Sequence, residues 1–216
     1  MLAENFFLCI AAPLCIALLF IKDDARRFCA FFLTGITVCL LCAYVGSFLV
    51  AITGFSVDDA AVYITPISEE LMKVMPLFFY YLVFEPSNNC LLTAAAAVGA
   101  GFATFENCFY LLSTDTVALS YLMIRGLAVG VMHIVCSMAP PMVLSLFRES
   151  KGITGTLIMG MLAAVVAYHG LYNLLVSAPG ISRAIGYALP LCTVAATFPL
   201  LRLRRSLLKH REATTE

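Results

Sequence analysis

The chain has 216 residues, of which 62% are hydrophobic and only 12% are charged, and its formal net charge is zero. Soluble domains carry about 25% charged residues, so this composition indicates an integral membrane protein in contact with a lipid bilayer. The zero net charge and the absence of interleaved basic and aromatic residues exclude a nucleic-acid-binding protein.

The nine cysteines lie almost entirely within apolar runs, which favours a packing role over a disulfide framework. Cys39 and Cys42 form a CxxC pair, but no second pair is present to complete a zinc site. We therefore expect this pair to pack within a helix.

Seven apolar runs are long enough to cross a bilayer, which takes about 17–25 residues. They cover residues 5–21, 28–53, 63–84, 90–113, 117–147, 153–177 and 184–201. The short joints leave no room for a soluble domain, so the sequence predicts one all-α transmembrane bundle followed by a basic tail at 202–216. The fifth run is too long for one straight span, and Pro140 with Pro141 is predicted to break or kink it.

Lys and Arg collect in the cytoplasmic loops of membrane proteins, and the most basic segment here is the C-terminal "RLRRSLLKHRE". If this segment is cytoplasmic, seven crossings place the N-terminus outside. The cytoplasmic side then holds ten Lys and Arg residues, whereas the outer side holds only Arg183. This bias predicts a multi-pass protein of a cell membrane with a cytoplasmic C-terminus.

Several polar residues lie inside the predicted spans, where even the gentlest insertion scale gives each unpaired charge a cost of about 2.5–3.5 kcal/mol. They are Glu69, Glu70, Lys73, Glu106, Arg125, His133, His169 and Asn173. At about 1.5 Å per residue, most of those on the third to sixth runs lie about 6–12 Å below the outer surface, with His133 near mid-membrane. Their shared depth predicts one water-filled cavity that opens toward the outer half of the bilayer.

Helical spacing places some of these residues on common faces. Glu69 and Lys73 are four residues apart, as are His169 and Asn173, so each pair shares a face. Lys73 is expected to be a structural counter-ion for Glu69. For His133, a helix–helix hydrogen bond and a functional role both remain open.

Carboxylates and imidazoles at one depth suit general acid–base work on a water molecule. No serine or cysteine nucleophile has an evident partnership with these histidines, so the simplest chemistry is direct attack of activated water on a peptide carbonyl. The same residue types are also zinc ligands. No HExxH is present, and the spacing leaves a metal open.

Three short motifs follow one another on successive runs: "EELMK" at Glu69 to Lys73, "FATFE" at Phe102 to Glu106, and "HGLYN" at His169 to Asn173. Together they resemble the EExxK, FxxxE and HxxxD motifs of the PrsW family of glutamic-type intramembrane proteases. Asn173 departs from that pattern, and HxxxN is similar to the related CAAX prenyl endopeptidases and bacterial Abi proteins. His133 matches a further histidine that this family carries between the second and third motifs.

The resemblance implies that Glu69, Glu70 and Glu106 activate and position water and that His169 and Asn173 stabilise the oxyanion. From the residues themselves we expect no cofactor, with zinc as the alternative. The resemblance also implies a membrane-anchored protein substrate, such as an anti-sigma factor in a bacterial plasma membrane, cut near the outer side.

A non-catalytic membrane scaffold or a proton-coupled transporter is the competing interpretation, because both also bury Glu, Lys and His groups. The small-residue stretch "AAAAVGAGFATF" in the fourth run fits either close helix packing or room for a substrate helix. For the protease interpretation, we predict a membrane-open groove beside the fourth run.

Overall fold

The computed structural model of the chain describes residues 2–113, 118–146 and 154–213. Within these residues the chain is all-helical, as predicted. The helices are α1 (Leu2–Ala17), α2 (Asp23–Thr53), α3 (Val57–Tyr63), α4 (Thr65–Phe84), α5 (Asn88–Leu112), α6 (Leu119–Leu146), α7 (Thr154–Ser177) and α8 (Ile181–Ala213).

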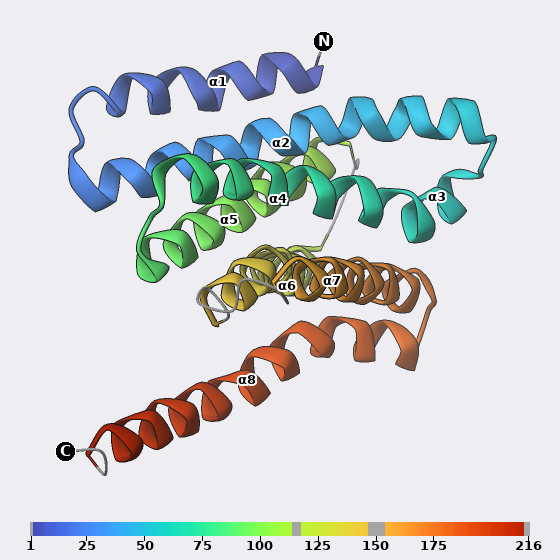
Figure 1. Cartoon of the computed structure of the whole chain (residues 1–216). Coiled ribbons are helices and arrows are strands. Elements are labelled where there is room, and N and C mark those ends of the chain that lie inside the picture. The colour runs from blue at the N-terminus through green and yellow to red at the C-terminus, as the bar shows by residue number, and fades with distance from the viewer. Residues whose placement is uncertain (1, 114–117, 147–153, 214–216) are drawn as a thin grey trace.

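The helices are arranged in layers, with α4 and α5 in the middle (Figure 1). On one side α2 packs on α5 and α4, and α1 lies on α2. On the other side α6 packs on α5, α7 packs on α4 and α6, and α8 covers α6 and α7. The layer of α4 and α5 therefore separates α1 and α2 from α6, α7 and α8.

Glycines allow α5 to approach both neighbouring helices closely. A Cβ atom on Gly101 would lie 2.0 Å from the carbonyl oxygen of Phe32 in α2, and one on Gly99 would lie 2.8 Å from the carbonyl oxygen of His133 in α6. Small residues at such positions let helix backbones come together in membranes. Close packing is therefore the role of the small-residue stretch, and it fixes the height of His133 against α5.

The joint expected between the second and third runs contains the short helix α3. Ser56 caps this helix, since its hydroxyl accepts a hydrogen bond from the Asp59 amide at 3.1 Å and donates one to the Asp59 carboxylate at 2.7 Å. A serine followed three residues later by an acidic side chain is a helix-start signal. The expectation of a simple loop was wrong because it gave this signal no weight.

The fifth run forms one helix, α6, which continues through Pro140 and Pro141 without the predicted break. Membrane helices tolerate internal proline where neighbouring helices support the freed backbone groups. Here Cys136 and Ala139, one turn before the prolines, pack in a core cluster with Val165 of α7.

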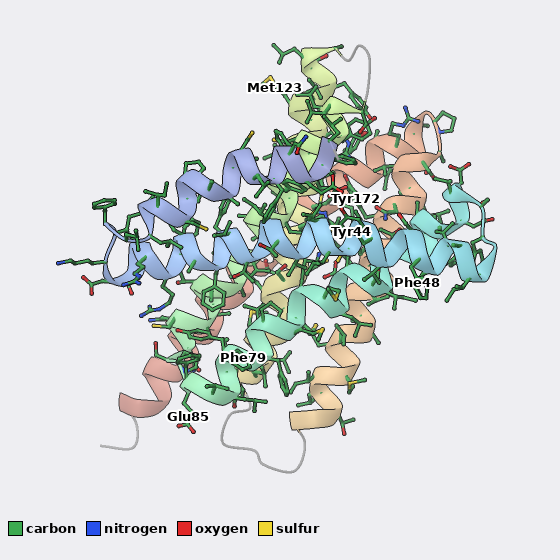
Figure 2. The ribbon with its side chains drawn as sticks, turned by 90° about the horizontal axis from the view of Figure 1, so that it is seen from above. Tyr44, Phe48, Phe79, Glu85, Met123 and Tyr172 are labelled. Atoms are coloured by element: carbon green, nitrogen blue, oxygen red, sulfur yellow. The ribbon has the colours of Figure 1, made fainter. Side chains whose placement is uncertain are left out.

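Within the described residues, four helices are long and apolar enough to cross a membrane: Asp23–Thr53, Asn88–Leu112, Leu119–Ser145 and Gly155–Ser177. The Leu2–Ala17 and Ile181–Thr197 helices are apolar but shorter, and α4 carries three charges. Large apolar side chains such as Phe48, Phe79 and Met123 are more than 60% exposed (Figure 2), as a lipid-facing surface requires. Seven crossings and the orientation of the termini stay predictions.

Candidate active site

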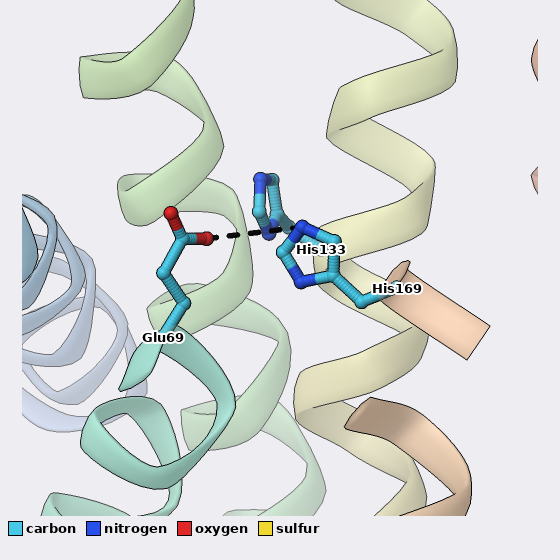
Figure 3. Close-up of side chains that lie close together, drawn as sticks. All are labelled: Glu69, His133 and His169. Atoms are coloured by element: carbon cyan, nitrogen blue, oxygen red, sulfur yellow. Dashed lines mark ion pairs between the residues drawn. The ribbon is translucent and has the colours of Figure 1, made fainter. Parts of the chain in front are cut away.

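Four helices bring the predicted polar residues together in the interior. Glu69, Glu70 and Lys73 come from α4, Glu106 from α5, His133 from α6 and His169 from α7. Figure 3 shows Glu69 directed toward the rings of His133 and His169. Glu69, Glu70, Glu106 and His169, which were expected at a similar depth, therefore share one cluster in the structure with Lys73 and with His133, which was expected to lie deeper.

Lys73 neutralises Glu70, which corrects the expected pairing with Glu69. Its ammonium lies 2.7 Å from Glu70 Oε1, and the side chains are 1% and 2% exposed. The same ammonium donates to His133 Nδ1 at 2.9 Å and lies 4.6 Å from the centre of the Phe102 ring. Lys73 thus turns toward the Glu70 side of α4, where it has three partners. Glu69 therefore has no ion pair with Lys73.

The hydrogen bonds of His133 determine which ring nitrogen holds the proton. An ammonium group can only donate, so His133 Nδ1 accepts from Lys73 and Nε2 carries the hydrogen. Nε2 then donates to Glu106 Oε2 at 2.6 Å. His133 therefore connects the ion pair of α4 to the carboxylate of α5 by two hydrogen bonds between helices, and its functional role stays a prediction.

His169 is oriented by Glu70 in the same manner. Its Nδ1–H donates to Glu70 Oε1 at 2.7 Å, because an ionised carboxylate can only accept. The opposite nitrogen, Nε2, lies 3.9 Å from Glu69 Oε2. That carboxylate oxygen is buried and has no hydrogen-bond partner. Glu69 and His169 thus face each other with acceptor atoms that a water molecule can satisfy.

The side chains of the cluster differ in their exposed fraction, and this difference shows which carboxylates a reactant can reach. The side chains of Glu106 and Glu69 are 32% and 12% exposed, whereas those of Glu70, Lys73, His133 and His169 are at most 3% exposed. Glu69 and Glu106 both line a cavity of about 310 Å³ between α4, α5, α6, α7 and α8. We call this the polar cavity.

Two further residues predicted from the sequence line the polar cavity. The Asn173 amide donates to the Ala61 carbonyl of α3 at 2.8 Å, so α3 positions it and one of its two N–H groups is engaged. Arg125 donates to Asn107 Oδ1 at 2.9 Å and lies 3.5 Å from Glu106 Oε1. Arg125, which had no assigned role, therefore supports the Glu106 carboxylate.

The sequence-based prediction did not include Tyr172, although it lies inside the "HGLYN" motif. Tyr172 is 2% exposed and lines the polar cavity, and its hydroxyl is buried without a hydrogen-bond partner. A buried donor that lacks a partner is costly. The hydroxyl is therefore available to a group that enters the cavity, and only the three-dimensional arrangement reveals it.

A second cavity, of about 240 Å³, lies on the opposite side of the α4–α5 layer. Residues of α1, α2, α4 and α5 form it, and its surface is mainly apolar. It shares Thr65, Glu69 and Glu106 with the polar cavity. We call it the apolar cavity. It lies beside α5, and the opening of a groove there to the membrane stays a prediction.

Glu69, His133 and His169 could together hold a metal ion, since one ligand atom from each lies within 4.8 Å of the others. Glu69 Oε2 and His169 Nε2 fit this role, and the Glu70 carboxylate accepts a hydrogen bond from the other ring nitrogen of His169, as carboxylates commonly do for metal-binding histidines. His133 does not fit, because Lys73 occupies Nδ1 and the Nε2 hydrogen points at Glu106. In this arrangement, two of the three ligand atoms, Glu69 Oε2 and His169 Nε2, are free to bind a metal ion.

Comparison with known proteins adds one match. The model of a family described as "PrsW family intramembrane metalloprotease" matches residues 25–202, which is most of the chain and includes every residue of the cluster. No curated protein and no solved structure matches the chain.

Proposed function

The chain belongs to the PrsW family of intramembrane proteases, and we propose that it hydrolyses a peptide bond of a membrane-anchored protein with water activated by glutamate. One observation carries this mechanism. Glu69, Glu106 and His169 line the cavities, while the buried Glu70, Lys73 and His133 fix their surroundings.

Glu69 is the proposed general base. A water in the polar cavity can donate its two hydrogens to Glu69 Oε2 and His169 Nε2, the two acceptors that face each other at 3.9 Å. Glu69 takes one proton as the water oxygen bonds to the peptide carbonyl carbon. The proton then passes to the peptide nitrogen as the C–N bond breaks, leaving one new carboxyl group and one new amine.

Glu106 is the proposed second carboxylate, which positions the substrate or the water. His133 donates to one of its oxygens at 2.6 Å, and Arg125 lies 3.5 Å from the other. These two donors hold the carboxylate in one orientation. Such fixed geometry around a reacting group accelerates reactions because the orientation is set before the substrate arrives.

The oxyanion formed during attack needs hydrogen-bond donors in the wall of the polar cavity. The unpartnered hydroxyl of Tyr172 is the first candidate. The second N–H of Asn173 is another, because its first is used by Ala61. His169 supports this site by orienting the water rather than by donating, since its Nδ1–H is engaged with Glu70.

We place the substrate in the same membrane: a single-span protein such as an anti-sigma factor, cut near the outer side of a bacterial plasma membrane. The family resemblance supports this placement, together with the predicted orientation of the helices. The shared depth of the reactive residues is consistent with a site that opens outward.

A metal-dependent mechanism is the second candidate, favoured by the family's description and by the free ligand atoms of Glu69 and His169. Chelation separates the two. Cleavage that survives prolonged dialysis against a strong chelator supports glutamate-activated water. Cleavage that is lost and then restored by zinc supports a metal, and His133 would then have to exchange its Lys73 and Glu106 partners for the ion.

Purified protein in liposomes provides the test of function. It is mixed with a panel of single-span substrates, and products are identified by mass spectrometry. We expect one new carboxyl terminus and one new amino terminus within or beside the span of at least one substrate. Absence of cleavage across the panel would contradict the proposal and favour a scaffold or a transporter.

A further inference from the structure

The apolar cavity points to a subsite next to the reactive carboxylates. We propose that this cavity binds one apolar side chain of the substrate, directly beside the bond that is cut. This inference rests on the proposed function. Binding of that side chain sets the sequence preference of the enzyme. The substrate class is thus narrowed to membrane-anchored segments with a bulky apolar residue at one of the two positions that flank the cleaved bond.

The size and surface of the cavity suit such a side chain. Cys42 and Gly46 of α2 and Phe105 and Phe109 of α5 line it. An apolar protein cavity of about 150 Å³ is large enough to bind benzene. A volume of about 240 Å³ therefore admits a leucine or phenylalanine side chain.

The position of the cavity supports a substrate side chain as its occupant. The apolar and polar cavities meet at Thr65, Glu69 and Glu106 and lie on opposite sides of the α4–α5 layer. Successive side chains of an extended peptide point in opposite directions. A peptide whose scissile bond lies at Glu69 would therefore direct one flanking side chain into the apolar cavity and the next into the polar cavity.

Helix α1 covers part of the apolar cavity on the side away from the polar cavity. Its Phe6 and Phe7 rings pack on Phe105 with centroids 5.6 and 6.1 Å away, and the Tyr44 hydroxyl of α2 donates to Glu4. Ala3 of α1 forms part of the lining. Helix α1 covers this side of the cavity, and the cavity is continuous with Glu69 and Glu106 on its other side. We therefore assign the cavity to the substrate segment that is cut rather than to a lipid chain.

Gly46→Leu tests the proposal by filling the cavity. A Cβ at Gly46 meets no atom within 4 Å, so the substitution begins in open space beside the cavity. The assay uses a single-span substrate that the wild type cleaves, with Ala, Leu or Phe at each of the two flanking positions in turn. At one position we expect the wild type to prefer Leu or Phe, and Gly46→Leu to lower kcat/KM for Phe relative to Ala by about tenfold or more.

Gly160→Leu is the matched control, since Gly160 also has open space, lies on α7 and lines neither cavity. It should keep the wild-type preference. Ala43→Leu, in the same cavity, decides the question if Gly46→Leu does not fold. An unchanged order of preference, or an equal loss on all substrates, would overturn the subsite while leaving wild-type cleavage, and hence the proposed function, intact.

Discussion

The Lys73 ammonium lies 2.7 Å from the Glu70 carboxylate, its neighbour three residues earlier, and not against Glu69 four residues earlier. This choice gives two adjacent glutamates different roles. Glu70 is neutralised, buried and bonded to His169, whereas Glu69 keeps one unpartnered oxygen beside the cavities. The two adjacent carboxylates of α4 thus have different surroundings: Glu70 supports His169, and Glu69 is the one that we propose reacts.

Lys73→Met is expected to destabilise the fold strongly. It leaves Glu70 as a buried charge with no cation beside it, and breaking one partner of a buried ion pair costs about 3–5 kcal/mol. Thermal unfolding in detergent measures the effect. The double variant Lys73→Met with Glu70→Gln should recover part of the stability; if it is no more stable than the single variant, the pair does not have the stated role.

Two substitutions at His133 separate its two hydrogen bonds. A glutamine amide can donate to Glu106 in place of Nε2, whereas an asparagine oxygen can accept from Lys73 in place of Nδ1. We expect His133→Gln to keep more activity than His133→Asn, by about tenfold, because the contact with Glu106 serves the reaction. Values of kcat/KM for the two variants decide this, and the reverse order would refute the assigned direction of proton donation.

Tyr172→Phe should lower activity without lowering stability. Its hydroxyl has no partner to lose in the resting protein, yet removal of one oxyanion donor costs about 10²–10³ in kcat. Tyr168→Phe is the control, because that hydroxyl lies 2.9 Å from Thr193 Oγ1 and its loss should affect stability alone. A Tyr172→Phe protein with wild-type kcat would remove Tyr172 from the mechanism.

Gly101→Ala is expected to disturb the packing of α5 on α2. Its Cβ would lie 2.0 Å from the Phe32 carbonyl oxygen, and such overpacking typically costs about 1–3 kcal/mol. Gly130→Ala, where a Cβ meets nothing within 4 Å, should be neutral or stabilising. Unfolding midpoints in detergent compare the two, and equal midpoints would show that α2 and α5 are not in contact there.

The sequence was sufficient to predict the all-helical membrane fold and the approach of Glu69, Glu106, His133 and His169, because long apolar runs and a common depth restrict where charges can meet. It was not sufficient for Lys73, since Glu69 and Glu70 are both within its reach along a helix. In the structure Lys73 contacts both Glu70 and His133 of α6, and the sequence does not specify this contact between helices.

Other features depended on contacts between distant segments. The Tyr172 hydroxyl lies in the polar cavity and the apolar cavity lies between α1, α2, α4 and α5; both depend on how several helices pack, and no local pattern specifies them. The helix α3 was missed for the opposite reason, since its signal at Ser56 is local and was taken as part of a loop.

The most direct test of the account is a comparison of Glu69→Gln with Glu85→Gln on a cleaved single-span substrate in liposomes. Glu85 is an exposed glutamate just beyond the end of α4 and lines neither cavity, so it controls for the substitution itself. We predict that Glu69→Gln lowers kcat/KM by about 10²–10⁴-fold, the usual contribution of a general base, while Glu85→Gln cleaves like the wild type. A Glu69→Gln protein that cleaves at the wild-type rate would contradict the assignment of Glu69 as the base.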